Sequence, residues 1–156
     1  MLEKAEYAGT SHLVATRSLV KYNNYVFRLI CRGLNMNGEL LEFGPGLGDF
    51  LERFKTKGKL IDAVENEPQF QETLRPLARK VVSRLDELPG LYDGIVSVNV
   101  LEHIEDDRAI LRDLYAKLKP GGYSICTCRP GRSCTGISTR WSITTGDTTG
   151  RTWWRK

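Results

Sequence analysis

The residues with the clearest potential for chemistry form a glycine-rich turn in the segment ELLEFGPGLGDF, residues 39–50. An apolar run is followed by Gly44, Gly46 and Gly48 at every second position, and Asp49 follows the last of them. Glycine lets a ligand approach bare backbone because it lacks Cβ and readily adopts positive φ. The spacing therefore predicts a strand that ends at a tight turn, where a nucleotide-like cofactor binds.

Two common glycine turns fit this spacing poorly. A phosphate-binding P-loop needs Lys and then Ser or Thr after its last glycine, and no Lys follows Gly48. The dinucleotide fingerprint is G-x-G-x-x-G, and here Asp49 occupies the position of its third glycine. A dinucleotide-binding oxidoreductase is therefore a distant alternative.

Acidic residues flank the turn in the sequence and at the next strand. Glu42 precedes Gly44 by two positions, and Glu65 ends the apolar run KLIDAVE. Further along the chain come AVENEP (63–68) and YDGIVSVNVLEHIEDDRAILRDLYAKLKPGG (92–122). With all three motifs in this order, the sequence over about residues 20–123 resembles the class I S-adenosylmethionine-dependent methyltransferases.

The resemblance implies S-adenosylmethionine as the cofactor. This ligand has no phosphate, so its site needs little positive charge, and the turn carries none. A carboxylate at Glu65 can accept hydrogen bonds from both ribose hydroxyls. The resemblance implies a cofactor-binding role for Glu42, Phe43, Gly44, Pro45, Gly46, Gly48, Glu65, Asn66, Asn99, Val100 and Leu101.

The implied reaction is methyl transfer by direct displacement at the sulfonium methyl group. The protein aligns the reactants and excludes water, while the cofactor supplies the reactivity. His103 is the nearby candidate for a general base, which is needed if the acceptor must first lose a proton. The alternative is that His103 only belongs to the start of a helix. The expected acceptor is a small molecule, or a glycan or lipid intermediate. The rival reading is a truncated, non-catalytic cofactor-binding fragment.

One position departs from the family pattern. Related chains often carry an acid just after the third strand, near the adenine amino group. Here Arg84 stands at about that place, with Asp86 and Glu87 as substitutes. The adenine contact therefore stays open.

Strand and helix patterns alternate along the chain, which predicts a parallel sheet covered by helices. The fold class is thus α/β, a three-layer Rossmann-like methyltransferase sandwich with a parallel central sheet, incomplete at its C-terminal strands. Helices are expected within 11–34 and over 47–54, 69–79 and 104–118, with Pro76 ending or kinking the third. Strands are expected over 39–43, 59–65, 80–82 and 93–100, and a turn over 119–122.

The composition indicates a soluble globular protein. The 156 residues are 40% apolar and 27% charged, close to the usual globular balance. The sequence shows neither a membrane-spanning stretch nor a signal peptide at its start. The expected location is therefore cytoplasmic, without membrane partners and with reduced thiols.

The segment 124–156 does not fit the rest of the chain. It carries six basic residues, one acid and all three tryptophans. Its Cys126, Cys128 and Cys134 lack a usual zinc spacing and a fourth ligand, so no metal site is expected. A basic arm that binds nucleic acid and a disordered tail are the two alternatives, and a nucleic-acid partner is not expected.

A frameshift is the preferred explanation of this segment. Thr codons begin with AC and Gly codons with GG, so a shifted frame can turn TTGDTTG (144–150) into YYRRYYR. The shifted reading is similar to the fifth strand and following segment of the family. The predicted domains are a helical segment over 1–37, a cofactor-binding α/β domain over 38–123, and an out-of-frame or disordered tail over 124–156. The chain would then lack a fifth strand of its own.

Overall fold

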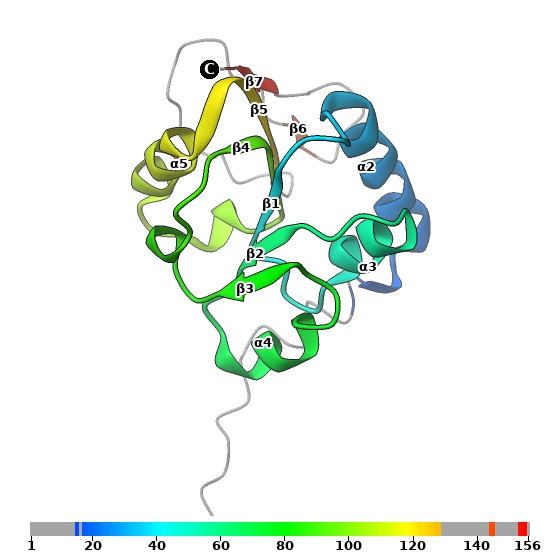
Figure 1. The fold of residues 1–156 in the computed structure, drawn as a ribbon. Coiled ribbons are helices and arrows are strands. Elements are labelled where there is room, and N and C mark those ends of the chain that lie inside the picture. Colours follow the sequence, from blue (N-terminus) through cyan, green and yellow to red (C-terminus); the bar gives the residue numbers. More distant parts are fainter. Residues whose placement is uncertain (1–14, 16, 129–143, 146–152, 156) are drawn as a thin grey trace, which may run out of the picture.

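A parallel sheet forms the centre of the molecule (Figure 1). The computed structural model describes residues 15, 17–128, 144–145 and 153–155. The strand order is β3-β2-β1-β4-β5-β6, with β7 antiparallel to β5 along the same edge as β6. The strands are β1 (Leu40–Phe43), β2 (Asp62–Val64), β3 (Lys80–Val82), β4 (Tyr92–Val98), β5 (Leu118–Cys128), β6 (Thr144–Thr145) and β7 (Trp153–Arg155).

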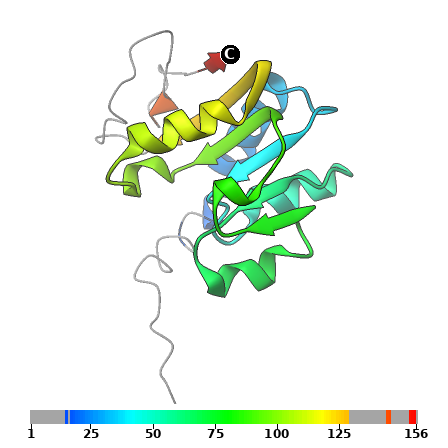
Figure 2. The same cartoon turned by 60° about the vertical axis from the view of Figure 1, so that its left-hand side comes forward.

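Helices cover both faces of the sheet (Figures 1 and 2). The α-helices are α2 (Val20–Gly33), α3 (Asp49–Thr56), α4 (Pro68–Leu74) and α5 (Asp107–Ala116), and the 3-10 helices are η1 (Leu85–Glu87) and η2 (Leu101–His103). Helices α2 and α3 lie on one face and α5 on the other, which confirms the predicted three-layer α/β architecture. No helix in the described part of the chain is long and apolar enough to cross a membrane.

Alternating side chains divide the core between the two faces of the sheet. Leu40 and Val96 pack with the apolar residues of α2, α3 and α4. Leu41 and Ile95, one position along each strand, pack with Leu114 of α5. Strands β1 and β4 are therefore buried on both faces, as their continuous apolar runs predict.

Two helices are shorter than their sequence patterns predict. Helix α4 ends at Leu74, because Pro76 could not continue its hydrogen bonding. Helix α5 begins only after Asp106, whose side chain caps it by accepting a hydrogen bond from the Ala109 N–H at 2.9 Å.

The expectation that the chain lacks a fifth strand of its own is corrected by β5. Its residues 123–127 pair in parallel with residues 94–98 of β4, and 124–128 lie beyond the predicted domain boundary. Ile125 and Cys126 are buried on opposite faces, at 6% and 2% exposure. The apolar alternation of this short stretch is enough to form a strand, whatever its reading frame. The expected turn over 119–122 lies within the bounds of β5, beside an irregularity of its pairing with β4. Most of the segment 129–156 lies outside the described residues.

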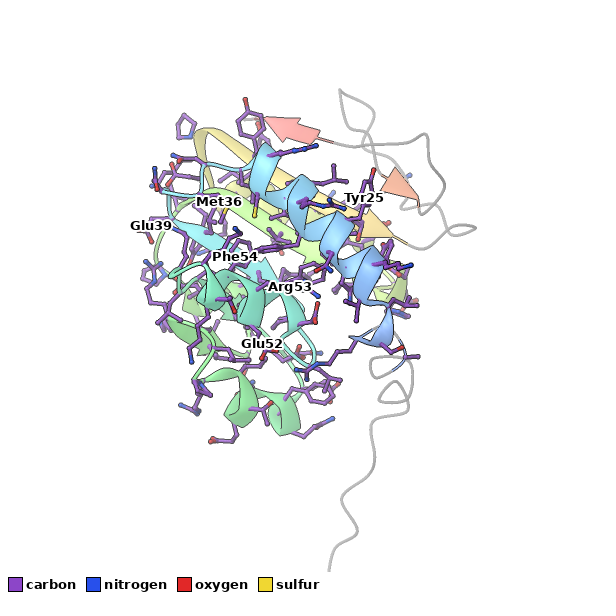
Figure 3. The ribbon with its side chains drawn as sticks, turned by 90° about the vertical axis from the view of Figure 1, so that its right-hand side faces the viewer. Tyr25, Met36, Glu39, Glu52, Arg53 and Phe54 are labelled. Carbon is purple, nitrogen blue, oxygen red and sulfur yellow. The ribbon has the colours of Figure 1, made fainter. Side chains whose placement is uncertain are left out.

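Helix α2 lies beside α3 (Figure 3), and polar contacts join the N-terminal helical segment to α3. Arg17 forms an ion pair with Glu52 at 3.0 Å. Arg53 pairs with Asp49 at 2.9 Å and also donates to the Asn24 side chain. These contacts hold α2 beside the start of α3, next to the glycine turn.

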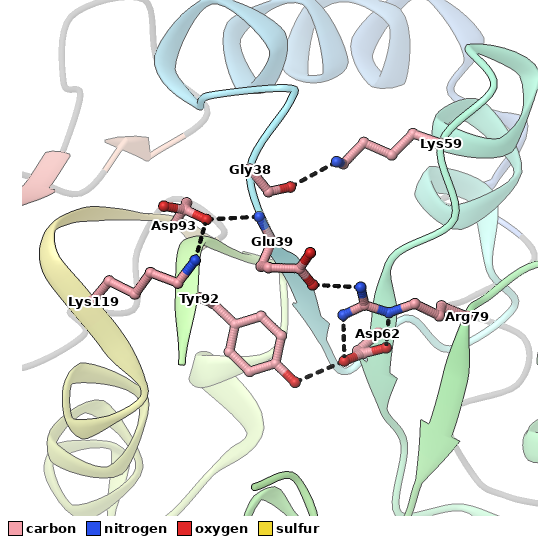
Figure 4. A network of polar contacts seen from close by, with 8 residues as sticks. All are labelled: Gly38, Glu39, Lys59, Asp62, Arg79, Tyr92, Asp93 and Lys119. Atoms are coloured by element: carbon pink, nitrogen blue, oxygen red, sulfur yellow. Dashed lines mark hydrogen bonds and ion pairs between the residues drawn. The ribbon is translucent and has the colours of Figure 1, made fainter. Parts of the chain in front are cut away.

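A polar network lies at the amino ends of the strands (Figure 4). Asp62, 6% exposed, accepts two hydrogen bonds from Arg79 at 2.8 and 2.9 Å and one from the Tyr92 hydroxyl at 2.8 Å. Burial opposes ionisation of Asp62, but the bonds from Arg79 and Tyr92 outweigh it and lower the pKa. Arg79 also pairs with Glu39. The network thus holds the amino ends of β1, β2 and β4 together.

Replacing Tyr92 by Phe should destabilise the protein by about 1–2 kcal/mol, because buried Asp62 loses one donor of its carboxylate. Urea unfolding measures this change in the free energy of unfolding. Tyr25→Phe is the matched control, since Tyr25 is 46% exposed and should cost little. Equal losses for the two variants would show that the Tyr92 hydroxyl bond does not stabilise the fold.

Candidate functional site

The glycine turn after β1 has the backbone conformation that the sequence predicts. Gly44, Gly46 and Gly48 adopt φ values of 74°, 55° and 78°, in the left-handed region that other residues rarely occupy. The Gly44 N–H donates to the Val64 carbonyl and the Gly48 N–H to the Pro45 carbonyl, each at 2.9 Å. The turn is therefore a defined structure that leads directly into α3.

Close packing also requires glycine at two of these positions. A Cβ on Gly44 would lie 2.6 Å from Cγ2 of Val100, and one on Gly48 would lie 2.7 Å from Cδ2 of Leu74. The first contact joins the turn after β1 to the segment after β4. These two strands are neighbours at the point where the strand order reverses, the usual ligand position in such sheets.

Glu65 lies directly beside the turn. Its carboxylate, on a residue only 5% exposed, accepts hydrogen bonds from the Gly46 N–H at 2.9 Å and the Glu67 N–H at 3.0 Å. Burial raises the pKa of Glu65, while the bonds from Glu67 and Gly46 act in the opposite direction. Each carboxylate oxygen has a second lone pair, so the group keeps capacity for two further donors.

Gln71 supports this position and was missed by the sequence analysis. Its side-chain amide donates to the Glu65 carbonyl at 2.7 Å and to the Ser83 hydroxyl at 2.9 Å. It thereby ties α4 to the ends of β2 and β3. A glutamine in a short helix belongs to no motif, so only the fold reveals its place.

Asn99 ends β4 in a strained conformation. Its φ of 56° makes it the one non-glycine residue with positive φ among those described. Its N–H donates to the Thr127 carbonyl at 2.8 Å, which anchors the loop to β5. Strain of this kind in a non-glycine residue is often found where a loop is shaped for a ligand.

The remaining predicted residues differ in where they lie. Leu101 is buried with Leu111 and Cys126 against α5, so a contact between Leu101 and a ligand would fall to its backbone. Phe43 packs toward the same side of the sheet. Asn66 and His103 are exposed, the latter in η2, three residues after Val100.

The position left open for an adenine contact holds an exposed ion pair. Arg84 donates to Asp86 at 3.0 and 2.6 Å, on side chains that are 74% and 64% exposed. Their pairing leaves Arg84 oriented toward Asp86, and the structure assigns neither of them to a ligand.

Glu42 is the most unusual side chain near the turn. It is 2% exposed, and its Oε2 has no hydrogen-bond partner among the described residues. Burial, together with the carboxylates of Asp49 and Glu65, raises the pKa of Glu42 to about 8. Glu42 is therefore a neutral carboxyl group at neutral pH in this structure.

This raised pKa predicts an unusual pH dependence of stability. The folded state holds the Glu42 proton up to about pH 8, whereas the unfolded chain releases it near its ordinary pKa of about 4.3. Stability from the neutral carboxyl is complete below the unfolded pKa and is lost as pH rises toward the folded pKa. Glu42→Gln should therefore unfold like wild type near pH 4.5 but be more stable by a few kcal/mol at pH 8. Thermal unfolding across this range measures the difference; parallel curves for the two proteins would contradict it.

A hollow lies at the other end of the strands from the glycine turn. It has a volume of about 490 Å³ and is lined by Glu39, Asp62, Arg79, Lys80, Leu88, Pro89, Gly90, Leu91 and Tyr92. These residues gather at the amino ends of the strands, away from the glycine turn, and Glu39 and Asp62 both pair with Arg79. No group of three or more His, Cys, Asp or Glu side chains that could hold a metal ion occurs in the described ranges. The residues that the sequence predicts for the cofactor, such as Gly44, Glu65 and Asn99, lie instead at the carboxyl ends of β1, β2 and β4.

Comparison with known proteins identifies the family of the chain. Residues 22–154 match a family described as a methyltransferase domain. The ubiquinone biosynthesis O-methyltransferase of Xanthomonas campestris pv. campestris is 28% identical over 94 residues, which cover 53% of this chain and 39% of that protein. The chain thus spans about two fifths of the length of the curated relatives it matches.

Solved structures share the fold. An amino pentose methyltransferase from Micromonospora echinaspora, solved with S-adenosylmethionine bound, superposes with a TM-score of 0.63 at 18% identity, covering 92% of this chain and 67% of that one. The glycopeptide N-methyltransferase MtfA gives a TM-score of 0.58 at 15% identity, covering 79% and 62%. At these identities the likeness concerns the fold alone. The family match covers most of the sequence, and so this chain belongs to the methyltransferase-domain family.

Proposed function

We propose that the chain binds S-adenosylmethionine at the glycine turn and transfers its methyl group to a small-molecule acceptor. The observation that carries this proposal is the buried Glu65 carboxylate, held by the Gly46 N–H beside a turn of three left-handed glycines. Family membership supports the same reading. A dinucleotide suits the site less well, because Asp49 occupies the position of the third glycine of the dinucleotide fingerprint.

The residues present fit this cofactor. The three glycines of the turn carry no Cβ, so a ligand can approach their backbone closely. In the proposed complex, Glu65 accepts hydrogen bonds from the ribose hydroxyls and the turn contacts the amino-acid portion. Asn99 and Val100 line the side formed by β4. The buried Oε2 of Glu42, which has no hydrogen-bond partner among the described residues, is available to accept a hydrogen bond from the ligand.

The bound cofactor would supply an electrophilic methyl group on a positively charged sulfur. The acceptor's lone pair forms the new bond to carbon, and the electrons of the sulfur–carbon bond return to sulfur. The chain's own contribution is orientation and exclusion of water. His103 is the proposed base for acceptors that must lose a proton, because it is exposed close to Val100.

The acceptor class is supported by relatives, whose names include an O-methyltransferase of ubiquinone biosynthesis and N-methyltransferases. A glycan or lipid intermediate is the second choice. A cytoplasmic location also stays proposed, supported by the free thiols of Cys31 and Cys126.

Calorimetric titration with S-adenosylhomocysteine and with NADH tests the cofactor. We expect saturable binding of the first and none of the second; binding of NADH alone would overturn the proposal in favour of an oxidoreductase. Transfer of a labelled methyl group from S-adenosylmethionine to any acceptor would then exclude a non-catalytic fragment.

The out-of-frame reading of the segment after β5 also remains a proposal. Its composition supports it, whereas the family match through residue 154 weighs against it. The nucleotide sequence across codons 115–156 decides between the two. A longer frame opened by one inserted or deleted base would support the proposal, and an intact frame would reject it.

A further inference from the structure

Glu42 is a buried carboxyl group, and a cation bound beside it would stabilise its charged form. It is a β1 residue between Ala63 of β2 and Val96 of β4 in the sheet register. Leu40, two residues earlier, packs in the core on the α2 and α3 face, so Glu42 points to the same face. A buried polar atom without a partner is costly, and Oε2 of Glu42 is such an atom among the described residues.

The charges around Glu42 all oppose its ionisation. Asp49 at the start of α3 and Glu65 after β2 both raise its pKa, in addition to burial. The nearby cation Arg53 is already paired with Asp49 at 2.9 Å. Strand β4 contributes Val96, and the buried polar residue of α2 is Asn23. The cations of α2 are all exposed: Lys21, Arg28 and Arg32.

We propose that Glu42 releases its proton when the cofactor binds and then acts as the counter-ion for the cofactor's positive charge. This inference rests on the proposed function, because it assumes that S-adenosylmethionine occupies the turn. The ligand carries a sulfonium cation and a zwitterionic amino-acid portion, so it brings a net positive charge into a site of three carboxyl groups. The proton leaves Glu42 for the buffer, and no other bond changes.

Coupled proton release makes cofactor affinity depend on pH. Below the pH at which Glu42 ionises in the empty site, each unit of pH should raise the affinity about tenfold, because one proton is lost per ligand bound. Asp49 and Glu65 share the site, so the comparison with a Glu42→Gln variant isolates the contribution of Glu42. Glu42→Gln cannot ionise, so its affinity should be weaker and nearly constant over the same range.

Calorimetric titration of the full chain with S-adenosylmethionine tests the proposal. At pH 6.5, titrations in two buffers with different ionisation enthalpies give the number of protons released. We expect about one for wild type, about one for the control Glu72→Gln, and none for Glu42→Gln. Glu72 is a suitable control because its side chain is 79% exposed and lies on α4.

The possible results separate this inference from the function on which it rests. Binding without proton release, or release that persists in Glu42→Gln, would overturn the role of Glu42 and leave the cofactor assignment intact. Absence of binding at every pH would overturn the cofactor assignment itself, and this inference with it.

Discussion

Replacing Glu65 by Ala should lower the affinity for S-adenosylmethionine at least a hundredfold. In the proposed complex, two ribose hydroxyls donate to this carboxylate, and hydrogen bonds to a charged group contribute about 1.5–3 kcal/mol each. The variant also removes the acceptor that holds the Gly46 N–H at 2.9 Å. The turn would then lose both its ligand contact and part of its own support.

Isothermal titration measures the affinity, and urea unfolding shows whether the variant still folds. Glu72→Ala is the matched control, because it removes a carboxylate that is exposed and paired only loosely with Arg75 at 3.3 Å. That control should bind like wild type. Unchanged affinity in a folded Glu65→Ala protein would remove the ribose contact from the account.

Gly44→Ala should destabilise the fold by about 2–5 kcal/mol and abolish cofactor binding. A left-handed conformation costs a non-glycine residue about 1–2 kcal/mol, and overpacking a tight contact costs about 1–3 kcal/mol more. The new Cβ would lie 2.6 Å from Cγ2 and 3.3 Å from Cβ of Val100. A β-branched side chain cannot easily rotate away from such a contact.

Gly58 offers a matched control for this substitution. Its φ is 75°, almost that of Gly44, but a Cβ there meets no atom within 4 Å. Gly58→Ala should therefore cost only the backbone term, about 1–2 kcal/mol. The Gly44→Ala/Val100→Ala double variant should recover part of the difference. Equal unfolding free energies for the two single variants would show that the contact between the turn and β4 is not tight.

The chemistry of the turn could be predicted well because it depends on local backbone requirements. Only glycine suits three positive φ values in five residues, and the acid that ends β2 is placed beside the turn by the pairing of adjacent parallel strands. The order of strands and helices could also be predicted, because apolar periodicity is a local property of each segment. Pro76 correctly indicated where α4 could not continue.

Other features depend on contacts between distant residues. The raised pKa of Glu42 arises first from its burial and then from Asp49 and Glu65, and the degree of burial is set by the packing of the whole fold. The bonds of Gln71 to β2 and β3, and the Asp62–Arg79–Tyr92 network, likewise exist only in the fold. The fifth strand was missed because the unusual composition of the whole segment outweighed the apolar alternation of its first residues.

Amide chemical shifts recorded during titration with S-adenosylmethionine test the central claim most directly, because they report where the ligand binds. The account predicts that the largest changes fall on Gly44, Gly46, Glu65 and Asn99, at the carboxyl ends of β1, β2 and β4. Residues of the hollow at the opposite edge, such as Gly90 and Leu91, should stay unchanged. Saturable changes confined to that hollow, or none at the glycine turn, would contradict the account.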